Sequence, residues 1–208
     1  MAINPSIFRA YDIRGRYPKE VNEEVALRLG RSLPVFFRGK RAVVGYDARL
    51  SSRSLQRALV RGLAAAGASV IRLGMVPTPV VSFAVLKSRA SFGVVVSASH
   101  NPKQYNAFKI IDRNANQIGW EQGLWKIAKL TKKEILPAPR PGGVRTDRRM
   151  KKRYIRTLVQ RFRRVARPFH PVTRKPRAEA RGGMAIRREA IHWMPRPEGR
   201  GVGVHSKF

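Results

Sequence analysis

Short apolar runs alternate with helical patterns along residues 22–131, and this alternation limits the fold more than any other feature. The segments "RAVVGY", "SVIRLG", "FGVVVS" and "AFKII" have the length and the β-branched content of buried strands. Helical patterns occupy residues 22–33, 51–66, 80–87 and 120–131, the first with Asn22 as N-cap and the second with Ser51 and Ser52 as candidate caps. Such alternation predicts an α/β fold with a mostly parallel or mixed sheet sandwiched by helices.

The chain has a large excess of positive charge. Its 208 residues contain 44 Lys and Arg against 12 Asp and Glu, a formal net charge of +32 at pH 7. This balance attracts phosphate, whether in nucleic acid, anionic lipid or a phosphorylated metabolite. The absence of cysteine excludes a disulfide framework and thiolate chemistry. The N-terminus lacks the pattern of a signal peptide and the longest apolar stretch is interrupted, so we expect a cytoplasmic protein without a membrane partner.

The character of the sequence changes after residue 136 and again near Arg161. Residues 137–208 hold 21 basic and 4 acidic residues, and from Arg161 onward no period of 2 or 3.6 is sustained. We therefore predict a folded domain over residues 1–158 and an irregular, Arg- and Pro-rich basic tail over residues 159–208.

Small and polar residues follow the strand "FGVVVS". Ligands of open α/β sheets gather beyond the carboxyl ends of the strands, so this position favours a functional site. A hydrolase pair of Ser99 and His100 is disfavoured, because neighbouring side chains at a strand end point to opposite faces and the Gly-x-Ser-x-Gly elbow is missing. For the Ser-His-Asn-Pro stretch on its own, a surface turn that begins at Asn101 is the competing interpretation.

Four motifs occur together and in order: "IFRAYDIRG", "VVGYDARLSS", "GLAAAGASVIRLGMVPTP" and "GVVVSASHNPKQYNAFKI". Together they closely resemble the alpha-D-phosphohexomutases, in particular the bacterial phosphomannomutase and phosphoglucomutase branch, over about residues 7–135. The resemblance implies that Ser99 bears the transferred phosphoryl group and that Lys109 is a candidate general acid/base. It implies further site residues in the same loop and in the first motif, namely His100 in the catalytic loop and Asn101, Tyr11 and Arg14 near substrate or phosphate.

Elementary electrostatics is compatible with these roles. A phosphorylated serine carries a charge of about −1.5 to −2, and Arg14, Lys103 and Lys109 are the cations that could lie near it. A lysine there could lose a proton if neighbouring cations and partial burial act on it. For Asp47 and Arg49 the sequence favours a structural role instead, since an aspartate at a strand end more often caps a turn or pairs with an arginine.

The resemblance also implies ligands for which much of the machinery is missing from this sequence. Related enzymes act on a phosphorylated hexose with a hexose 1,6-bisphosphate primer, and bind Mg²⁺ through the serine phosphate and an Asp-Gly-Asp-Gly-Asp-Arg loop. Neither that loop nor the family's later sugar and phosphate loops occur here; Ser99, through its phosphate, is the one metal contact expected. We therefore expect the chain alone to be inactive or nearly so, and a separate fragment with the missing domains could complement it.

Two hypotheses account for the basic tail. In the first, the chain is a truncated or frameshifted mutase whose coding sequence left the family frame after about Leu158. In the second, it is a non-catalytic basic protein whose tail binds nucleic acid without sequence specificity, with an affinity that falls steeply with salt. A chain that ends near Leu158 separates the two, because the second hypothesis requires it to bind more weakly than the full chain.

Overall fold

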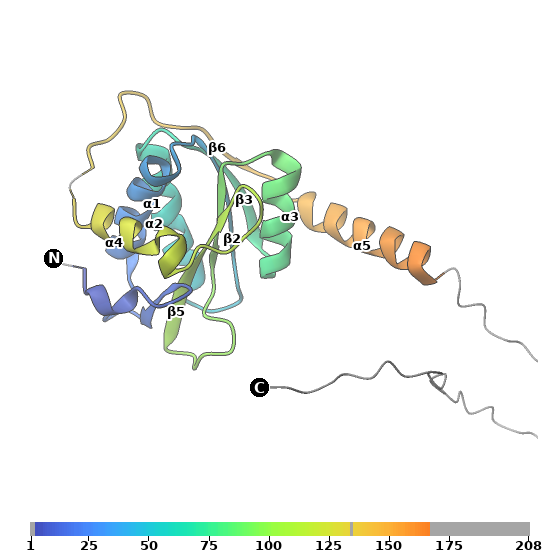
Figure 1. The fold of residues 1–208 in the computed structure, drawn as a ribbon, viewed down its shortest axis with the longest axis horizontal. Coiled ribbons are helices and arrows are strands. Elements are labelled where there is room, and N and C mark those ends of the chain that lie inside the picture. The colour runs from blue at the N-terminus through green and yellow to red at the C-terminus, as the bar shows by residue number, and fades with distance from the viewer. Residues whose placement is uncertain (1–2, 134, 167–208) are drawn as a thin grey trace, which may run out of the picture. The chain divides into compact units, whose positions relative to one another are not determined.

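The computed structural model describes residues 3–133 and 135–166, and in this part of the chain helices and strands alternate as predicted (Figure 1). The strands are β1 (Ile13–Arg16), β2 (Arg41–Tyr46), β3 (Ser69–Met75), β4 (Phe92–Val96), β5 (Tyr105–Asp112) and β6 (Val144–Thr146). The helices are α1 (Glu23–Phe37), α2 (Ser52–Ala65), α3 (Thr78–Ser88), α4 (Trp125–Thr131) and α5 (Met150–Ala166). A 3-10 turn η1 (Pro5–Ile7) precedes β1, and a π-helical turn η2 (Trp120–Leu124) leads into α4.

The six strands form one mixed sheet in the order β1-β5-β4-β2-β3-β6. The pairs β2–β3, β2–β4 and β3–β6 are parallel, whereas β4–β5 and β1–β5 are antiparallel. From β2 the chain passes through α2 to β3 on one side, and then through α3 back past β2 to β4 on the other side. The direction of the strand order therefore reverses between β2 and β4, where α/β sheets tend to place their sites.

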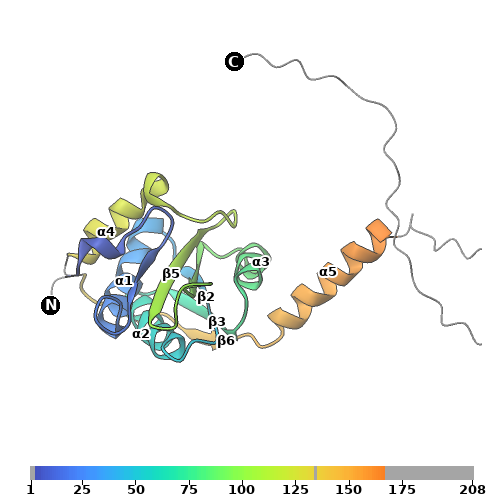
Figure 2. The ribbon, with the colours of Figure 1, turned by 90° about the horizontal axis from the view of Figure 1, so that it is seen from below.

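Helices cover both faces of the sheet, which confirms the predicted sandwich (Figures 1 and 2). Because side chains alternate along a strand, Val44, Val94 and Phe108 face the core under α1, α2 and α4. Val43 and Val95 face the smaller core under α3. Two buried faces on the central strands explain why their sequences are continuous apolar runs.

Two glycines set the close packing of α1 against α2. A Cβ at Gly62 would lie 2.1 Å from the carbonyl oxygen of Leu27, and a Cβ at Gly30 would lie 2.3 Å from that of Leu59. These are backbone contacts that a flexible side chain cannot relieve. Gly62 and Gly30 thus allow the two helices to approach closely enough to bury their leucine faces over the sheet.

Helix α5 packs on the body only through its first turns (Figure 2). Met150 is buried in the core under α3, and the Tyr154 ring lies 5.4 Å from that of Phe83. Beyond this contact the helix has one exposed apolar face with helical spacing, which we call the α5 stripe: Ile155, Leu158, Val159, Phe162 and Val165. The helix has seven basic and no acidic residues. Its polar side is therefore strongly cationic.

Several local predictions hold and others need correction. The Asn22 side chain accepts from the N–H of Val25 at 3.1 Å, as expected of an N-cap. Ser51 occupies the N-cap position of α2, but neither Ser51 nor Ser52 caps it with its side chain, because both hydroxyls bond elsewhere. Strands β1 and β6 and helix α5 were not anticipated. The predicted boundary after Leu158 falls inside α5, and residues 167–208 of the predicted tail lie outside the described residues.

No helix within residues 3–133 and 135–166 is both long enough and apolar enough to cross a membrane.

Candidate functional site

The candidate site lies where the parallel strands β2 and β4 end side by side. Asp47 and Arg49 follow β2, and Ser99 follows β4. The N–H of Asp47 donates to the carbonyl of Val96 at 3.0 Å, which joins the two strand ends directly. These residues come from the two strands between which the strand order reverses, so the topology brings them together.

The residues that connect β4 to β5 form a short hairpin connection that we call the Ser99 loop (residues 97–104). Ser99 is exposed and has φ 53°, a left-handed backbone conformation that is costly for a residue with a side chain. Its N–H donates to the hydroxyl of Ser97 at 3.1 Å, and the N–H of Asn101 donates to the carbonyl of Ala98 at 3.0 Å. The loop is thus ordered by internal hydrogen bonds and presents the Ser99 hydroxyl outward.

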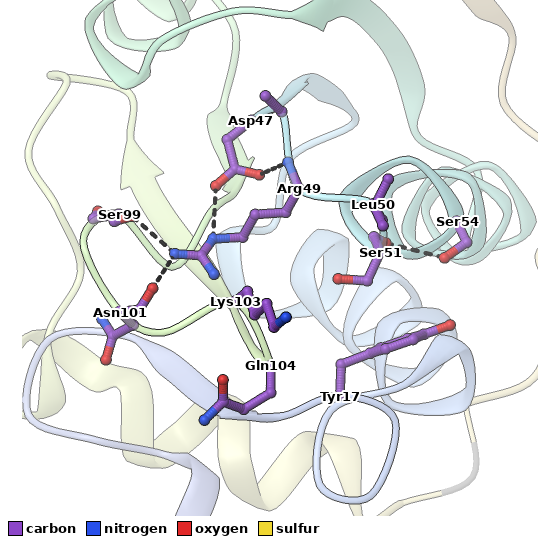
Figure 3. A pocket seen from close by; sticks show the side chains of 11 residues that line it. Tyr17, Asp47, Arg49, Leu50, Ser51, Ser54, Ser99, Asn101, Lys103 and Gln104 are labelled. Carbon is purple, nitrogen blue, oxygen red and sulfur yellow. Dashed lines mark hydrogen bonds and ion pairs between the residues drawn. The ribbon is translucent and has the colours of Figure 1, made fainter.

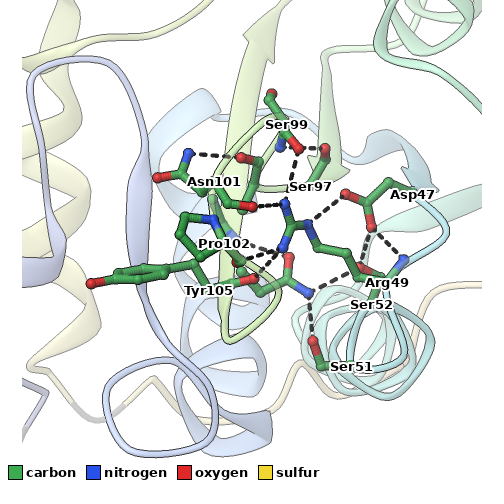
Figure 4. Close-up of polar contacts among 12 residues, drawn as sticks. Asp47, Arg49, Ser51, Ser52, Ser97, Ser99, Asn101, Pro102 and Tyr105 are labelled. Carbon is green, nitrogen blue, oxygen red and sulfur yellow. Dashed lines mark hydrogen bonds and ion pairs between the residues drawn. The ribbon is translucent and has the colours of Figure 1, made fainter.

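The Arg49 side chain crosses to the Ser99 loop and donates to four backbone carbonyls (Figure 4). We call this arrangement the Arg49 clamp. The acceptors are the carbonyls of Ser99 at 2.9 Å, Pro102 at 2.8 Å and Tyr105 at 3.1 Å, together with that of Asn101. The remaining Nε lies 3.4 Å from the carboxylate of Asp47. The structural role expected for Asp47 and Arg49 is therefore what the structure shows.

Two rows of side chains run across the sheet beside this loop. In one row Arg14 of β1 is opposite Ala107 of β5, whose carbonyl accepts from the N–H of Ser97 at 2.8 Å. In the next row Lys109 of β5 is paired with Asp12, just before β1: the Lys109 Nζ lies 2.9 Å from a carboxylate oxygen of Asp12. By strand alternation, Arg14, Lys109 and Ser97 share one face of the sheet. The structure thus places Arg14 and Lys109 on the face of the sheet that also bears the side chain of Ser97, the first residue of the Ser99 loop.

Asp12 is a site residue that the sequence analysis missed. Its side chain is only 5% exposed and lies between Lys109 and Arg14, whose Nε is 3.6 Å from the second carboxylate oxygen. The ion-pair partner of Lys109 is thus a carboxylate, which also lies beside the cation Arg14. An acidic residue directly after Tyr11 and two positions before Arg14, in a motif otherwise expected to bind phosphate, was the available signal.

A hollow of about 980 Å³ lies beside the Ser99 loop (Figure 3). Ser99 and Asn101 line it, together with Lys103 and the start of α2. Arg14, Lys109, His100 and Tyr11 are not among its lining residues. The hollow at the start of α2 and the cluster of Asp12, Arg14 and Lys109 therefore have no lining residue in common.

The other predicted site residues are at the periphery. His100 is exposed beside Ser99, and Tyr11 is 74% exposed, with its carbonyl accepting from the Gln117 side chain. Asn101 is partly buried, and its amide donates to the carbonyl of Ala98 at 2.8 Å. Asn101 shapes the loop, while His100 and Tyr11 are open to a molecule that approaches from solvent.

The described residues do not form a metal site by themselves. Within residues 3–133 and 135–166, no group of three or more His, Asp or Glu side chains could hold a metal ion. Asp47 and Asp12 are each engaged by basic side chains. Neither carboxylate is therefore available as a free ligand for Mg²⁺.

Comparison with known proteins gives a consistent result. Residues 5–137 match the family described as phosphoglucomutase/phosphomannomutase, alpha/beta/alpha domain I. A phosphomannomutase of Klebsiella pneumoniae is 41% identical over 134 residues, which cover 64% of this chain and 85% of that protein. An Escherichia coli phosphomannomutase is 41% identical over 134 residues and 29% of its length, and a Xanthomonas campestris phosphohexose mutase is 39% identical over 152 residues and 34% of its length.

The solved structures agree with the sequence relatives. A phosphoglucomutase/phosphomannomutase family protein of Burkholderia thailandensis superposes with a TM-score of 0.65 at 36% identity, covering 76% of this chain and 36% of that one. The chain thus spans about a third of the length of the Burkholderia, Escherichia and Xanthomonas proteins. The resemblance noted from the four motifs is confirmed. The chain belongs to the phosphoglucomutase/phosphomannomutase family, and the part of that family that it contains is domain I.

Proposed function

We propose that this chain supplies the phosphoryl-carrying domain of a phosphohexomutase, which interconverts hexose 1-phosphate and hexose 6-phosphate through a hexose 1,6-bisphosphate. The observation that carries the proposal is the placement of Ser99: an exposed hydroxyl on a rigid loop, where two neighbouring strands end. The first residue of its loop, Ser97, shares a face of the sheet with Arg14 and Lys109. Membership of the family is what links this geometry to phosphoryl transfer.

The residues have separate parts in the proposed step. The bond between phosphorus and the Ser99 Oγ breaks as a bond forms to a hydroxyl oxygen of the sugar phosphate. Lys109 delivers a proton to the leaving Oγ and regains one from the sugar hydroxyl, so the lysine ends the step with the same number of protons. Arg14 offsets charge on the phosphoryl oxygens, and phosphoryl transfer depends chiefly on such positioning and charge stabilisation. His100 and Asn101 flank the carrier, and Tyr11 lies open beside the substrate.

Mg²⁺ is proposed only for the assembled enzyme. Among the described residues, the phosphate on Ser99 would be the one contact for the metal, because their carboxylates do not form a metal site. A metal that offsets developing charge lowers the barrier by several kcal/mol, so transfer is slow without it. We therefore propose that the chain alone is inactive or nearly so, and that the bound sugar phosphate requires domains outside this sequence.

We propose a partner for the α5 stripe on the same grounds. Five apolar side chains that are 43–73% exposed on one helix are unusual for an isolated soluble surface. The chain spans about a third of the length of several relatives, so a fragment carrying the remaining domains is the occupant that fits. Ile155 and Leu158 are the apolar residues of the stripe nearest to the body of domain I.

The test combines intact mass with a mutase assay. The purified chain is weighed before and after phosphatase treatment, and a phosphatase-sensitive mass of one phosphoryl group is expected, absent from Ser99→Ala. The assay then follows glucose 1-phosphate with glucose 1,6-bisphosphate as primer, for the chain alone and with the remaining domains of a relative. Turnover is expected only in the mixture.

The outcomes separate the parts of the proposal. Turnover by the chain alone would show that the missing domains are unnecessary. Turnover in the mixture with both the wild type and Ser99→Ala would remove Ser99 from the role of carrier. A mixture that forms a stable complex, as judged by size-exclusion chromatography, and yet neither turns over nor phosphorylates Ser99 would overturn the proposed activity.

A further inference from the structure

The guanidinium group of Arg49 directs its N–H donors at the protein itself. A guanidinium has five N–H donors. The two terminal nitrogens of Arg49 donate to three carbonyls of the Ser99 loop and to that of Tyr105, and each nitrogen donates to two of the four. The Nε is directed at Asp47, 3.4 Å away. Arg49 lines the large hollow, but its donors are all directed at the protein itself (Figures 3 and 4).

The base of the Arg49 clamp is held from three elements. The Asp47 carboxylate accepts from the backbone N–H of Arg49 at 3.0 Å and from the hydroxyl of Ser52 in α2. The buried amide of Asn106 in β5 donates to Ser52 at 2.9 Å and to Ser51 at 2.7 Å. The end of β2, the start of α2 and the start of β5 are therefore joined by one polar network, which fixes where the guanidinium can lie.

The Ser99 loop needs such support because its conformation is intrinsically unfavourable. A serine at φ 53° lies in the left-handed region, where the side chain of an L-residue crowds the backbone and raises the free energy relative to ordinary backbone regions. The Ser99 carbonyl belongs to the strained residue itself, and it is one of the four that the guanidinium contacts, at 2.9 Å. Hydrogen bonds from a charged guanidinium are stronger than those between neutral groups, so the four bonds from Arg49 can offset the cost of the left-handed backbone at Ser99.

We propose that Arg49 is a positioning residue for phosphoryl transfer. It holds the Ser99 hydroxyl in the position and orientation that transfer requires, and it does not touch the substrate. This inference rests on the proposed role of Ser99 as the carrier. Arg49 therefore lines the hollow at the start of α2 but holds the Ser99 loop and does not bind an incoming phosphate. Within that lining, Lys103 is the exposed cation that lacks a polar partner among the described residues.

The first test measures the loop without any activity. In the full chain, amide hydrogen exchange is followed by NMR in wild type, Arg49→Lys and the matched control Arg53→Lys, an exposed arginine one turn further along. A lysine keeps the charge but cannot reach four carbonyls at once. Exchange at Ser99 and Asn101 should quicken at least tenfold in Arg49→Lys, while Val44 and Val94 in the central strands keep their protection.

The second test asks whether a placed guanidinium is what matters. Arg49→Ala should show the same fast exchange, and millimolar guanidinium ion should restore slow exchange, whereas tetramethylammonium should not. Asp47→Asn keeps the arginine but weakens its orientation, and an intermediate effect is expected. Melting temperatures of all variants verify that the loop, and not the whole fold, has changed.

The third test measures phosphoryl uptake by Ser99 from glucose 1,6-bisphosphate in the mixture with the remaining domains. Arg49→Lys should lower the maximal rate about 100-fold, the size of effect that a misplaced reacting group produces. The bisphosphate concentration for half-maximal rate should stay within a factor of two, because Arg49 does not bind it.

Each result decides a different claim. Unchanged exchange in Arg49→Lys and Arg49→Ala would overturn the clamp. Faster exchange with an unchanged rate of uptake would overturn its role in transfer, as would a rise in the half-saturating concentration with the maximal rate preserved. If the wild type takes up no phosphoryl group in the mixture, the proposed function fails, and the exchange data still decide whether Arg49 holds the loop.

Discussion

Lys109 and Asp12 form an ion pair across two strands, with the Lys109 Nζ 2.9 Å from a carboxylate oxygen that belongs to a side chain only 5% exposed. The residues are 97 positions apart in sequence. The antiparallel register of β1 and β5 makes them neighbours, because Ile13 is opposite Phe108. The lysine proposed to carry a proton thus has a fixed position, and its partner is a buried acid.

Replacing Asp12 with asparagine should therefore affect both stability and transfer. The variant leaves Lys109, whose side chain is 17% exposed, without its counter-charge, and we expect a loss of about 2 kcal/mol in the free energy of unfolding. With Lys109 less well oriented, phosphoryl uptake by Ser99 in the mixture should fall at least tenfold. Urea denaturation and intact mass measure the two effects.

Glu121→Gln is the control for this prediction, since Glu121 is exposed and forms no ion pair among the described residues. It should change neither quantity measurably. Asp12→Asn with wild-type stability and wild-type uptake would show that the ion pair has no part in the site.

Ser99→Gly should stabilise the fold relative to Ser99→Ala, although neither variant can carry a phosphoryl group. Both lose the hydroxyl, but glycine adopts φ 53° without the penalty that alanine retains. We expect Ser99→Gly to be more stable by about 1 kcal/mol in urea denaturation. If Ser99 is the carrier, as proposed, its strained backbone is a feature kept for function at the expense of stability.

Ser82, in the middle of α3, provides the matched comparison. In a helix interior, alanine is favoured over glycine by about 0.5–1 kcal/mol, so Ser82→Ala should be more stable than Ser82→Gly. The same order at both positions would contradict the conformational explanation for Ser99.

Gly62→Ala should be strongly destabilising because the added methyl group would meet the carbonyl of Leu27 in α1. Helices α1 and α2 must separate to accept it, and we expect a loss of about 3 kcal/mol, measured by thermal or urea denaturation. Arg57→Ala, on the exposed side of the same helix, should stay within about 0.5 kcal/mol of wild type. A small effect at Gly62 would mean that the helices are less closely packed than described.

Binding to nucleic acid tests the alternative role of the basic segment. Residues 137–208 contain 21 basic and 4 acidic residues, so a short DNA duplex should bind with an affinity that falls steeply as salt rises. A chain ending at Leu158 should bind at least tenfold more weakly at about 0.1 M salt and show a shallower dependence of affinity on salt. Equal affinity of the two chains, in a fluorescence anisotropy titration, would show that residues 159–208 are not responsible.

The architecture was largely predictable because the central strands and their covering helices carry local patterns. Val43 and Val44 of β2 are buried on opposite faces of the sheet. A strand with two buried faces has a continuous apolar sequence, which can be recognised without the structure. Strands β1 and β6 lacked such a signal. The segment Ile13–Arg16 alternates with charged residues and pairs with a strand some 90 residues later, while Val144–Thr146 is exposed throughout. Pairing of this kind depends on distant partners that local sequence does not specify.

The candidate site was predictable in its residues but less so in its connections. The motifs single out Ser99, Arg14 and Lys109, and the structure places Arg14 and Lys109 on one face of the sheet, while the roles of all three stay predictions. The contacts of Arg49 with four carbonyls, and of Asp12 with Lys109, join segments 50–97 residues apart. A motif identifies a residue type at a position, whereas the partner of that residue is decided by the register of the sheet.

The hairpin that bears Ser99 has one more consequence. Both flanks of the loop continue into paired strands, and its middle is bonded to a side chain from a third segment, so the serine has almost no freedom to travel. If one phosphoryl group leaves this oxygen and a different one comes back, as proposed, the sugar has to change ends relative to a serine that keeps its place. On that proposal, the turning within this site falls to the small molecule.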